Sequence, residues 1–161
     1  SGAKQIAVSH TADAGRLWTV TSDLTISNPN AAITGIELAD RTRLMVFNDL
    51  EHGRHRLVLA ASWLRTNNDT SSQAAKDNYS PWKIIQVLED ESASQGNPKE
   101  EFSYPYLSMN KQGQVFLVYT WNRKRIKSIT WEPNNLVTYL HQVHQEIAST
   151  MDTPTEMKEA K

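Results

Sequence analysis

Short segments with the composition of β-strands follow one another along most of this chain. They are rich in Val, Ile, Leu, Phe, Tyr and Trp, and polar residues or Gly, Pro and Asn separate them, as in strands joined by turns. The segments cover residues 5–9, 17–24, 32–38, 43–48, 56–63, 82–89, 102–109, 114–121 and 125–131. The sequence therefore predicts an all-β core of antiparallel strands.

An internal repeat groups these segments. Residues 36–47 and 106–119 look like two copies of one hairpin, about seventy residues apart, and the turns at 40–42 and 110–113 join strands of similar character. Units of four strands at such a spacing are typical of β-propeller blades. The first blade would then contribute its third and fourth strands, the middle blade all of its strands, and the last blade its first three. A closed propeller usually needs about four blades, so we expect a partial propeller of about two to three four-stranded antiparallel blades.

The sequence TADAGRLW at residues 11–18 predicts a tight turn that satisfies its own polar groups. The Thr11 hydroxyl and the Asp13 carboxylate can accept backbone N–H groups within the turn, and Gly15 allows a positive φ without steric cost. Trp18 is expected to bury its ring as the chain enters the next strand, while its indole N–H finds an acceptor. The pattern matches the Asp-box, the recurrent hairpin of sialidase-type propellers.

A second, decayed copy of the same turn is AKDNYSPW at residues 75–82, which keeps the Asp and the Trp but has lost the Ser/Thr and the Gly. We therefore expect Trp18 and Trp82 at equivalent positions on the rim of the propeller. The polar stretch 67–80 that contains most of this copy is predicted to be a surface loop.

The strand pattern ends at residue 131, and helical spacing follows. The apolar residues of this region recur every three or four positions: Leu136, Leu140, Val143 and Ile147. With Asn134 or Asn135 as N-cap, they predict a helix of about a dozen residues with one apolar face. The expected organisation is a partial propeller over 3–132, a C-terminal helix over 133–149 and a disordered tail over 150–161.

The composition excludes several classes of protein. The 161 residues amount to one domain, and a net charge of −1 gives no basis for binding nucleic acid or a membrane surface. The absence of cysteine excludes disulfides and thiol catalysis. His141 and His144 share a helix face with a spacing that allows metal binding, but no third ligand is near. We therefore expect neither a metal nor another cofactor.

Several further motifs occur in an order and spacing that point to one family. They are NPN at 28–30, VFND at 46–49, GRHRL at 53–57, EFSYP at 101–105 and VYTWNRKRIK at 118–127. Together with the Asp-box, they make the chain resemble the predicted-neuraminidase branch of the sialidase superfamily, whose members contain BNR-like repeats. The resemblance covers most of residues 11–131.

This resemblance implies the C-terminal part of a sialidase-like exo-glycoside hydrolase that acts on glycans, sialylated ones among them, and that is incomplete as a catalytic unit on its own. Sialidases use a Tyr nucleophile in place of a carboxylate, because their sugar substrate carries its own negative charge beside the anomeric carbon. Arginines bind the substrate carboxylate in a bidentate manner. The alternative is a non-catalytic propeller that binds carbohydrate or protein through the same face.

The resemblance also assigns roles to residues of this chain. Tyr104 would be the nucleophile, since it opens the innermost strand of the last blade, although it can equally be a packed strand aromatic. Glu37 would take the proton of the Tyr, unless strand alternation turns its side chain outward. The remaining candidates are expected to bind substrate: Arg54, Arg56, Asn48 and Arg125. Only one of Arg54 and Arg56 is expected to point inward, and both can also be surface residues of a turn.

The chain departs from the family in its arginines. A complete carboxylate site needs three arginines, but only Arg65 lies between Arg56 and Tyr104, and the usual acid/base Asp belongs to blades that precede this sequence. The expected partners are thus a carbohydrate ligand and either the missing N-terminal blades or a second copy, paired through open sheet edges. Nucleic acid and membranes are not expected as partners.

Overall fold

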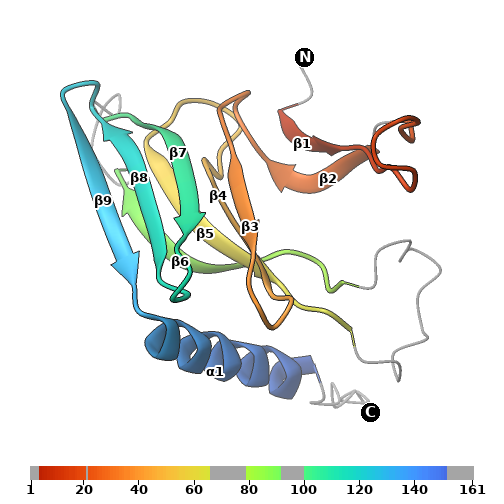
Figure 1. The fold of residues 1–161 in the computed structure, drawn as a ribbon. Helices are drawn as coiled ribbons and strands as arrows, with labels where there is room; N and C mark the ends of the chain where they lie inside the picture. The colour runs from red at the N-terminus through yellow and green to blue at the C-terminus, as the bar shows by residue number, and fades with distance from the viewer. Residues whose placement is uncertain (1–3, 21, 66–78, 92–99, 152–161) are drawn as a thin grey trace, which may run out of the picture.

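The computed structural model describes residues 4–20, 22–65, 79–91 and 100–151. The described residues form strands followed by one helix: β1 (Gln5–Val8), β2 (Ser22–Ser27), β3 (Thr34–Glu37), β4 (Arg43–Phe47), β5 (Arg56–Ser62), β6 (Lys83–Asp90), β7 (Phe102–Met109), β8 (Val115–Trp121), β9 (Arg125–Trp131) and α1 (Pro133–Met151) (Figure 1). Each predicted strand segment is present, which confirms the all-β core. The first part of the decayed turn copy at 75–82, most of the loop predicted over 67–80 and most of the tail predicted over 150–161 lie outside the described residues.

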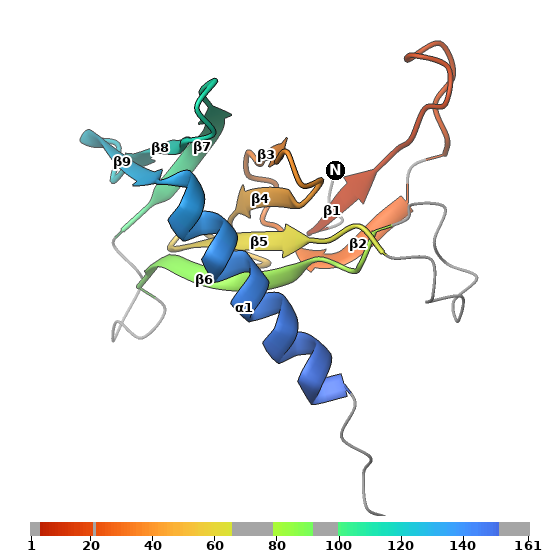
Figure 2. The same cartoon turned by 60° about the horizontal axis from the view of Figure 1, so that its bottom comes forward.

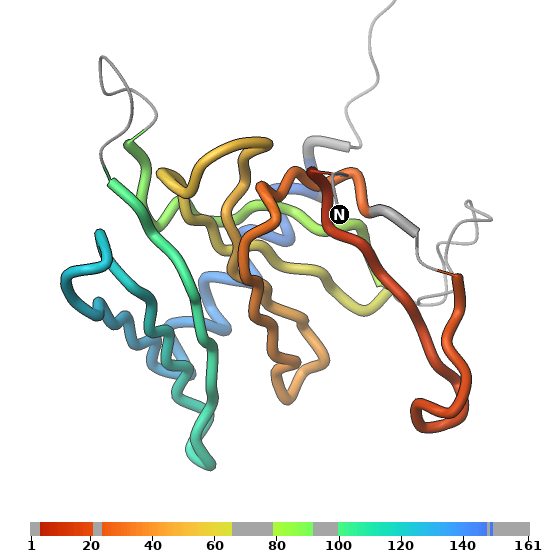
Figure 3. The backbone as a smooth tube through the Cα atoms, turned by 90° about the horizontal axis from the view of Figure 1, so that it is seen from above, coloured from red at the N-terminus to blue at the C-terminus, as the bar shows by residue number. Residues whose placement is uncertain are grey.

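The strands form three antiparallel sheets in chain order: β1-β2, β3-β4-β5-β6 and β7-β8-β9. Seen from above, the four-stranded sheet lies between the other two (Figure 3). The first strands of the two larger sheets are neighbours, because the Leu107 N–H of β7 donates to the Thr34 hydroxyl of β3 at 3.1 Å. This places blade beside blade, with the innermost strands in contact.

The predicted hairpin repeat is present in the backbone. In the β3–β4 turn the Leu38 N–H donates to the Thr42 carbonyl, and in the β7–β8 turn the Asn110 N–H donates to the Gln114 carbonyl. The residue that closes each turn has a positive φ, 68° at Arg41 and 83° at Gly113. The two hairpins thus share one turn geometry at equivalent places in their sheets.

The Asp-box turn forms as predicted. One Asp13 carboxylate oxygen accepts the N–H groups of Arg16 (3.1 Å) and Leu17 (2.9 Å) and the hydroxyl of Thr11 (2.8 Å). The Trp18 indole N–H donates to the Gly15 carbonyl at 3.1 Å. These bonds occupy the polar groups of the turn locally, so the turn can project from the sheet without support from other elements.

Two expectations about this region were wrong. The second strand begins at Ser22, and not near Leu17, and Trp18 leaves 62% of its surface exposed where burial was expected. Trp82, in contrast, packs half-buried against a cluster that includes Met45 and Phe47. The two tryptophans therefore have unlike surroundings, because the Asp-box arm extends beyond the apolar core.

The core lies between the sheets. β4 and β5 are buried along nearly their whole length, which is typical of strands covered on both faces. One apolar cluster joins the four-stranded sheet to β7, β8 and α1, and a second joins it to β1 and β2. The alternation of apolar and polar residues is therefore weakest in these two central strands, β4 and β5.

The C-terminal helix is longer than the dozen residues expected, and its N-cap is another residue than predicted. α1 spans 19 residues and runs across the lower ends of the sheets in Figure 1. Pro133 occupies its first position, where a missing N–H costs nothing, and the Leu136 N–H already donates to the Glu132 carbonyl. The cap position is therefore Glu132, and not Asn134 or Asn135.

The apolar face of α1 packs as predicted. Leu136 and Leu140 are buried in the larger cluster, and Val143 and Ile147 contact its edge. Figure 2 shows the helix crossing the sheets near β5 and β6, and the Tyr139 hydroxyl donates to the Ile85 carbonyl of β6 at 2.5 Å. No helix among the described residues is long and apolar enough to cross a membrane.

Candidate functional site

Backbone contacts hold the β4–β5 connection against the start of β7. The Phe102 N–H donates to the Arg54 carbonyl at 2.8 Å. The buried Asn48 amide at the end of β4 donates to the carbonyls of Phe102 (3.0 Å) and Arg56 (2.7 Å) and reaches the Arg54 carbonyl at 3.5 Å. These contacts fix the position of Arg54 relative to the first residues of β7.

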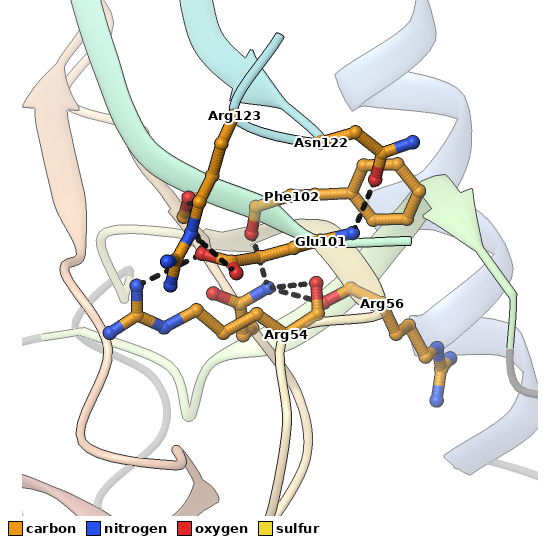
Figure 4. A network of polar contacts seen from close by, with 8 residues as sticks. Arg54, Arg56, Glu101, Phe102, Asn122 and Arg123 are labelled. Carbon is orange, nitrogen blue, oxygen red and sulfur yellow. Dashed lines mark hydrogen bonds and ion pairs between the residues drawn. The ribbon is translucent and has the colours of Figure 1, made fainter. Parts of the chain in front are cut away.

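The β8–β9 turn is fixed to the same place. The Asn122 N–H donates to the Glu101 carbonyl at 2.7 Å, and the Glu101 N–H donates to the Asn122 side-chain oxygen at 2.6 Å. Arg123 follows in the turn, and both Asn122 and Arg123 have a positive φ, of 53° and 54°. Three segments from two neighbouring sheets therefore meet at Glu101 (Figure 4).

The Glu101 carboxylate joins two arginines. One oxygen lies 3.4 Å from Nη1 of Arg54 and 3.1 Å from the Ser103 hydroxyl, which donates to it, and the other oxygen lies 3.0 Å from Nε of Arg123. Figure 4 shows both guanidinium groups turned toward this carboxylate. Burial alone would raise the pKa of Glu101, but the hydrogen bonds from Ser103 and Arg123 and the two positive charges outweigh it and lower the pKa. Glu101 is therefore ionised at neutral pH.

Tyr104 stands next to this group in an unusual backbone conformation. Its φ is 53°, and it lies where the register between β7 and β8 shifts, between Ser103 and Tyr106. The ring is 63% exposed, and the Arg54 guanidinium carbon lies 5.4 Å from its centroid, within the range of a cation–π contact. In the part of the chain that the structure describes, no residue hydrogen-bonds the Tyr104 hydroxyl. The bulge thus presents an accessible phenol beside a positive charge.

Of the two arginines in the β4–β5 region, only Arg54 joins Tyr104. Arg56 extends in another direction (Figure 4) and forms ion pairs with Asp49 (3.3 Å) and Asp90 (3.4 Å). Burial raises the pKa of Asp49, and the charge of Arg56 opposes that rise. Arg56 therefore ties the β4–β5 connection to β6.

Two other predicted binding residues have different surroundings from those expected. The Asn48 side chain is fully buried, so it connects backbone segments and presents no surface to a ligand. The Arg125 guanidinium carbon lies 5.1 Å from the Trp121 ring centroid, over its cross-strand neighbour. Within the group formed by Tyr104, Arg54 and Glu101, Asn48 reaches only the Arg54 backbone carbonyl, and the Arg125 guanidinium lies over Trp121 instead.

Glu37 lies at the far end of its sheet from Tyr104. It pairs with Arg43 at the β3–β4 turn, whereas Arg54 lies beyond the opposite end of β4, a strand of five residues that rise about 3.3 Å each. Its carboxylate accepts hydrogen bonds from Arg43 (3.1 Å) and Tyr79 (2.9 Å), which lower its pKa. The structure therefore does not bring Glu37 to the hydroxyl of Tyr104, and the carboxylate that pairs with Arg54 beside Tyr104 is that of Glu101.

Sequence reasoning missed Glu101 and Arg123. Both lie within the motifs that carry the family resemblance, at the start of EFSYP and in the middle of VYTWNRKRIK. Their contact depends on the β8–β9 turn folding back onto the residue before β7, which no local pattern indicates.

The described residues contain no group of three or more His, Cys, Asp and Glu side chains that could hold a metal ion. The two helix histidines considered earlier do not form such a group. The His144 ring stacks on Trp63 with centroids 4.8 Å apart and an angle of 4° between the planes, so it serves the packing of α1 against the residue that follows β5.

Comparisons with known proteins agree with this architecture. Residues 1–117 match the BNR repeat-like domain, and no curated protein sequence gives a significant match. The leech intramolecular trans-sialidase, solved with 2,7-anhydro-Neu5Ac after soaking with 3'-sialyllactose, aligns with a TM-score of 0.59 and 19% identity over 82% of this chain. The intramolecular trans-sialidase from Ruminococcus gnavus, solved with oseltamivir carboxylate, aligns with a TM-score of 0.61 and 18% identity over 84% of this chain.

The chain spans 21% of the leech structure and 29% of the Ruminococcus gnavus structure. Its three adjacent antiparallel sheets thus correspond to part of a sialidase propeller, and the predicted fold class, an all-β partial propeller with a C-terminal helix, is confirmed. By the match to its repeat, the chain belongs to the BNR repeat-like domain family.

Proposed function

We propose that this chain supplies the nucleophile and part of the anion-binding site of a sialidase-like exo-glycoside hydrolase that acts on glycans with an acidic terminal sugar. The observation that carries the proposal is Tyr104: an exposed phenol in a left-handed backbone conformation, beside the Arg54 guanidinium. Strained residues of this kind gather at functional sites because the surrounding structure must hold them in place.

In the proposed reaction, the Tyr104 oxygen bonds to the anomeric carbon while the glycosidic C–O bond breaks, and water later displaces the tyrosine. A phenol suits this step because a carboxylate nucleophile would be repelled by the negative charge of the sugar. Arg54 binds the sugar carboxylate through charge-assisted hydrogen bonds. The acid that protonates the departing oxygen is not among the side chains gathered at Glu101, so the site is incomplete as a catalytic unit on this chain alone.

One observation favours the second candidate, a propeller that binds an acidic carbohydrate without cleaving it. The Glu101 carboxylate is occupied by Arg54, Arg123 and Ser103 and is ionised. It does not hydrogen-bond the Tyr104 hydroxyl, and Glu37 is far from it. A base for the phenol proton would therefore have to come from elsewhere, and without one the site binds its ligand but does not react with it.

Binding of a sialoside tests the binding of an acidic sugar, which both candidate functions share. The chain is titrated with the methyl α-glycoside of N-acetylneuraminic acid and with the methyl ester of the same compound, which lacks the negative charge. We expect the acid to bind more tightly than the ester, and Arg54→Gln to remove this preference, because hydrogen bonds to charged groups are about twice as strong as neutral ones.

Arg56→Gln is the matched control, because Arg56 lies two residues away and pairs with Asp49 and Asp90. It should leave the preference for the acid in place. Equal binding of acid and ester by the unmodified chain would contradict the proposal.

A further inference from the structure

We infer that the outer strand β9 recognises a second copy of this chain, by pairing antiparallel with its β9 about a two-fold axis at Ser128. The inference goes beyond the proposed function, since it concerns a sheet edge and not the group around Tyr104. β9 is the last strand of its sheet, and no described strand pairs with its other side. It lies on the outer side of the molecule in Figures 1 and 2, and α1 runs from its end toward the other sheets.

β9 is a regular and exposed strand. Its seven residues, from Arg125 to Trp131, all pair with β8 without a register shift. The first four of them and Thr130 are exposed. An edge of this kind presents a row of N–H and C=O groups in regular order, and such a row favours pairing with another strand.

The edges of the other sheets carry features that oppose such pairing. β6 pairs with β5 through two register shifts, and the Ile85 carbonyl of β6 accepts the Tyr139 hydroxyl of α1. β1 and β2 pair with a register shift as well. β3 and β7 lie beside each other, joined by the bond from Leu107 to Thr34. Irregular register and covering elements are common means of protecting an edge, and β9 has neither among the described residues.

Charged side chains also protect edges, and β9 carries two cations, Arg125 and Lys127. The Lys127 ammonium forms an ion pair with Glu89 of β6, and the same carboxylate accepts the Tyr119 hydroxyl at 2.5 Å. The Arg125 guanidinium lies over the Trp121 ring, with 5.1 Å between the guanidinium carbon and the ring centroid. Both cations are therefore held by groups of their own chain, and neither opposes an approaching strand as an unpaired charge does.

The positions of these cations select one register for two copies of β9. Pairing about Ser128, the central residue of the strand, gives every residue of β9 an opposite residue. Arg125 then lies opposite Trp131 of the second copy, which suits a cation–π contact, and Lys127 lies opposite Ile129. A shift of the axis to Lys127 would place two lysines directly opposite each other, which destabilises a sheet. A shift in the other direction would leave part of the strand unpaired.

The strand is thus complementary to itself, which is why a second copy is the occupant that we infer. Its pairing joins two three-stranded sheets into one continuous sheet. Because the two copies of β9 run antiparallel, the groups around Tyr104 lie at opposite ends of the joined sheet, and neither obstructs the other.

Cross-linking through one introduced cysteine tests the register, because the chain has no cysteine of its own. In Ser128→Cys the two Cβ atoms lie opposite each other at about 4.5–5.5 Å, close to the separation that a disulfide bridges. Thr130→Cys is the matched control, exposed on the same face of β9 but about 13 Å from its counterpart in the second copy. Under mild oxidation of the micromolar chain, Ser128→Cys should form the disulfide-linked dimer at least about tenfold faster than Thr130→Cys, as measured by non-reducing electrophoresis.

Amide hydrogen exchange of the unmodified chain is a second measurement and needs no variant. The N–H groups of β9 that point away from β8 should exchange slowly at high concentration and rapidly after dilution. Stacking of two apolar sheet faces, in contrast, would leave these N–H groups unpaired and rapidly exchanging at every concentration, and that result would overturn the inference.

Equal rates of cross-linking in the two cysteine variants would overturn it as well. So would a monomer at every concentration, which would indicate that the edge of β9 pairs with a strand of different sequence. None of these results changes the expected preference for the acidic sugar, so the proposed function is tested separately.

Discussion

At Tyr104 the backbone adopts a left-handed conformation, which costs a residue with a side chain roughly 1–2 kcal/mol. Asn122 and Arg123 adopt it as well, so strained residues from two different segments meet at Glu101. The hydrogen bonds from Asn48 and Asn122 to neighbouring backbone hold these segments together. Conformational strain here accompanies the exposed phenol and the two arginines that pair with Glu101, which is the arrangement expected of a functional site.

The lowered pKa of Glu101 predicts how the free energy of unfolding depends on pH. The folded protein lowers its pKa below the ordinary value of 4.5, so its contacts stabilise the fold above that pH and lose their effect as the pH falls through the lower, folded value. Glu101→Gln should therefore flatten the decline of the free energy of unfolding in acid. Urea denaturation at several pH values measures this decline, with Glu100→Gln as the control. Parallel curves for the unmodified chain and Glu101→Gln would contradict the assignment.

At the scale of elements, Asn48 links β4, the β4–β5 connection and β7 through its buried amide. Asn48→Ala removes the amide that donates to the carbonyl of the buried Phe102 and to that of the part-buried Arg56, and we expect it to lower the free energy of unfolding by about 3 kcal/mol. Asn134→Ala on the exposed side of α1 is the control, and its free energy of unfolding should stay within about 0.5 kcal/mol of that of the unmodified chain. Chemical denaturation compares the two, and similar midpoints for both variants would contradict this role of Asn48.

The strands were predictable because alternation and turn residues act locally. The second strand was placed too early because Leu17, Trp18 and Val20 have strand composition, yet they lie on an arm that reaches past the core, where they are 76%, 62% and 93% exposed. The apolar face of α1 was predictable from the spacing of its residues. The first residue of the helix, in contrast, depended on Pro133 and on the turn before it.

The site was predictable only in part. Tyr104 and Arg54 belong to motifs, and the structure brings them together. Glu37 does not join them, because its register opposite Arg43 puts it at the other end of the sheet. Glu101 and Arg123 come together through the pairing of whole hairpins, and no spacing in the sequence expresses that contact.

For the molecule as a whole, the sheets end in edges that no other strand pairs with among the described residues. β9 is the outer strand of a three-stranded sheet, and β1 and β2 form a sheet by themselves. The face of the last sheet leaves Tyr106, Val118 and Ile126 exposed, by 64%, 37% and 67%. Tyr106 and Val118 are cross-strand neighbours, so this face is an apolar surface of the kind that usually contacts another element.

We therefore expect the chain to associate, with itself or with further blades. Sedimentation velocity of the isolated chain over a micromolar dilution series should show concentration-dependent association, and Ile126→Lys should weaken it by placing a charge on the apolar face. Lys124→Gln serves as the surface control. A single monomer at every concentration would mean that the edges and this face need no partner.

Tyr104 is the proposed nucleophile, and turnover tests this role most directly. In the natural protein that contains this sequence, Tyr104→Phe removes the hydroxyl that would attack the sugar and leaves the ring beside Arg54. Hydrolysis of a fluorogenic sialoside should fall by about 10³-fold or more with the thermal midpoint preserved. Tyr106→Phe, on the same strand and equally exposed, should stay close to the unmodified protein. Near-normal turnover in Tyr104→Phe, or a loss of the same size in Tyr106→Phe, would contradict the assignment of Tyr104 as nucleophile.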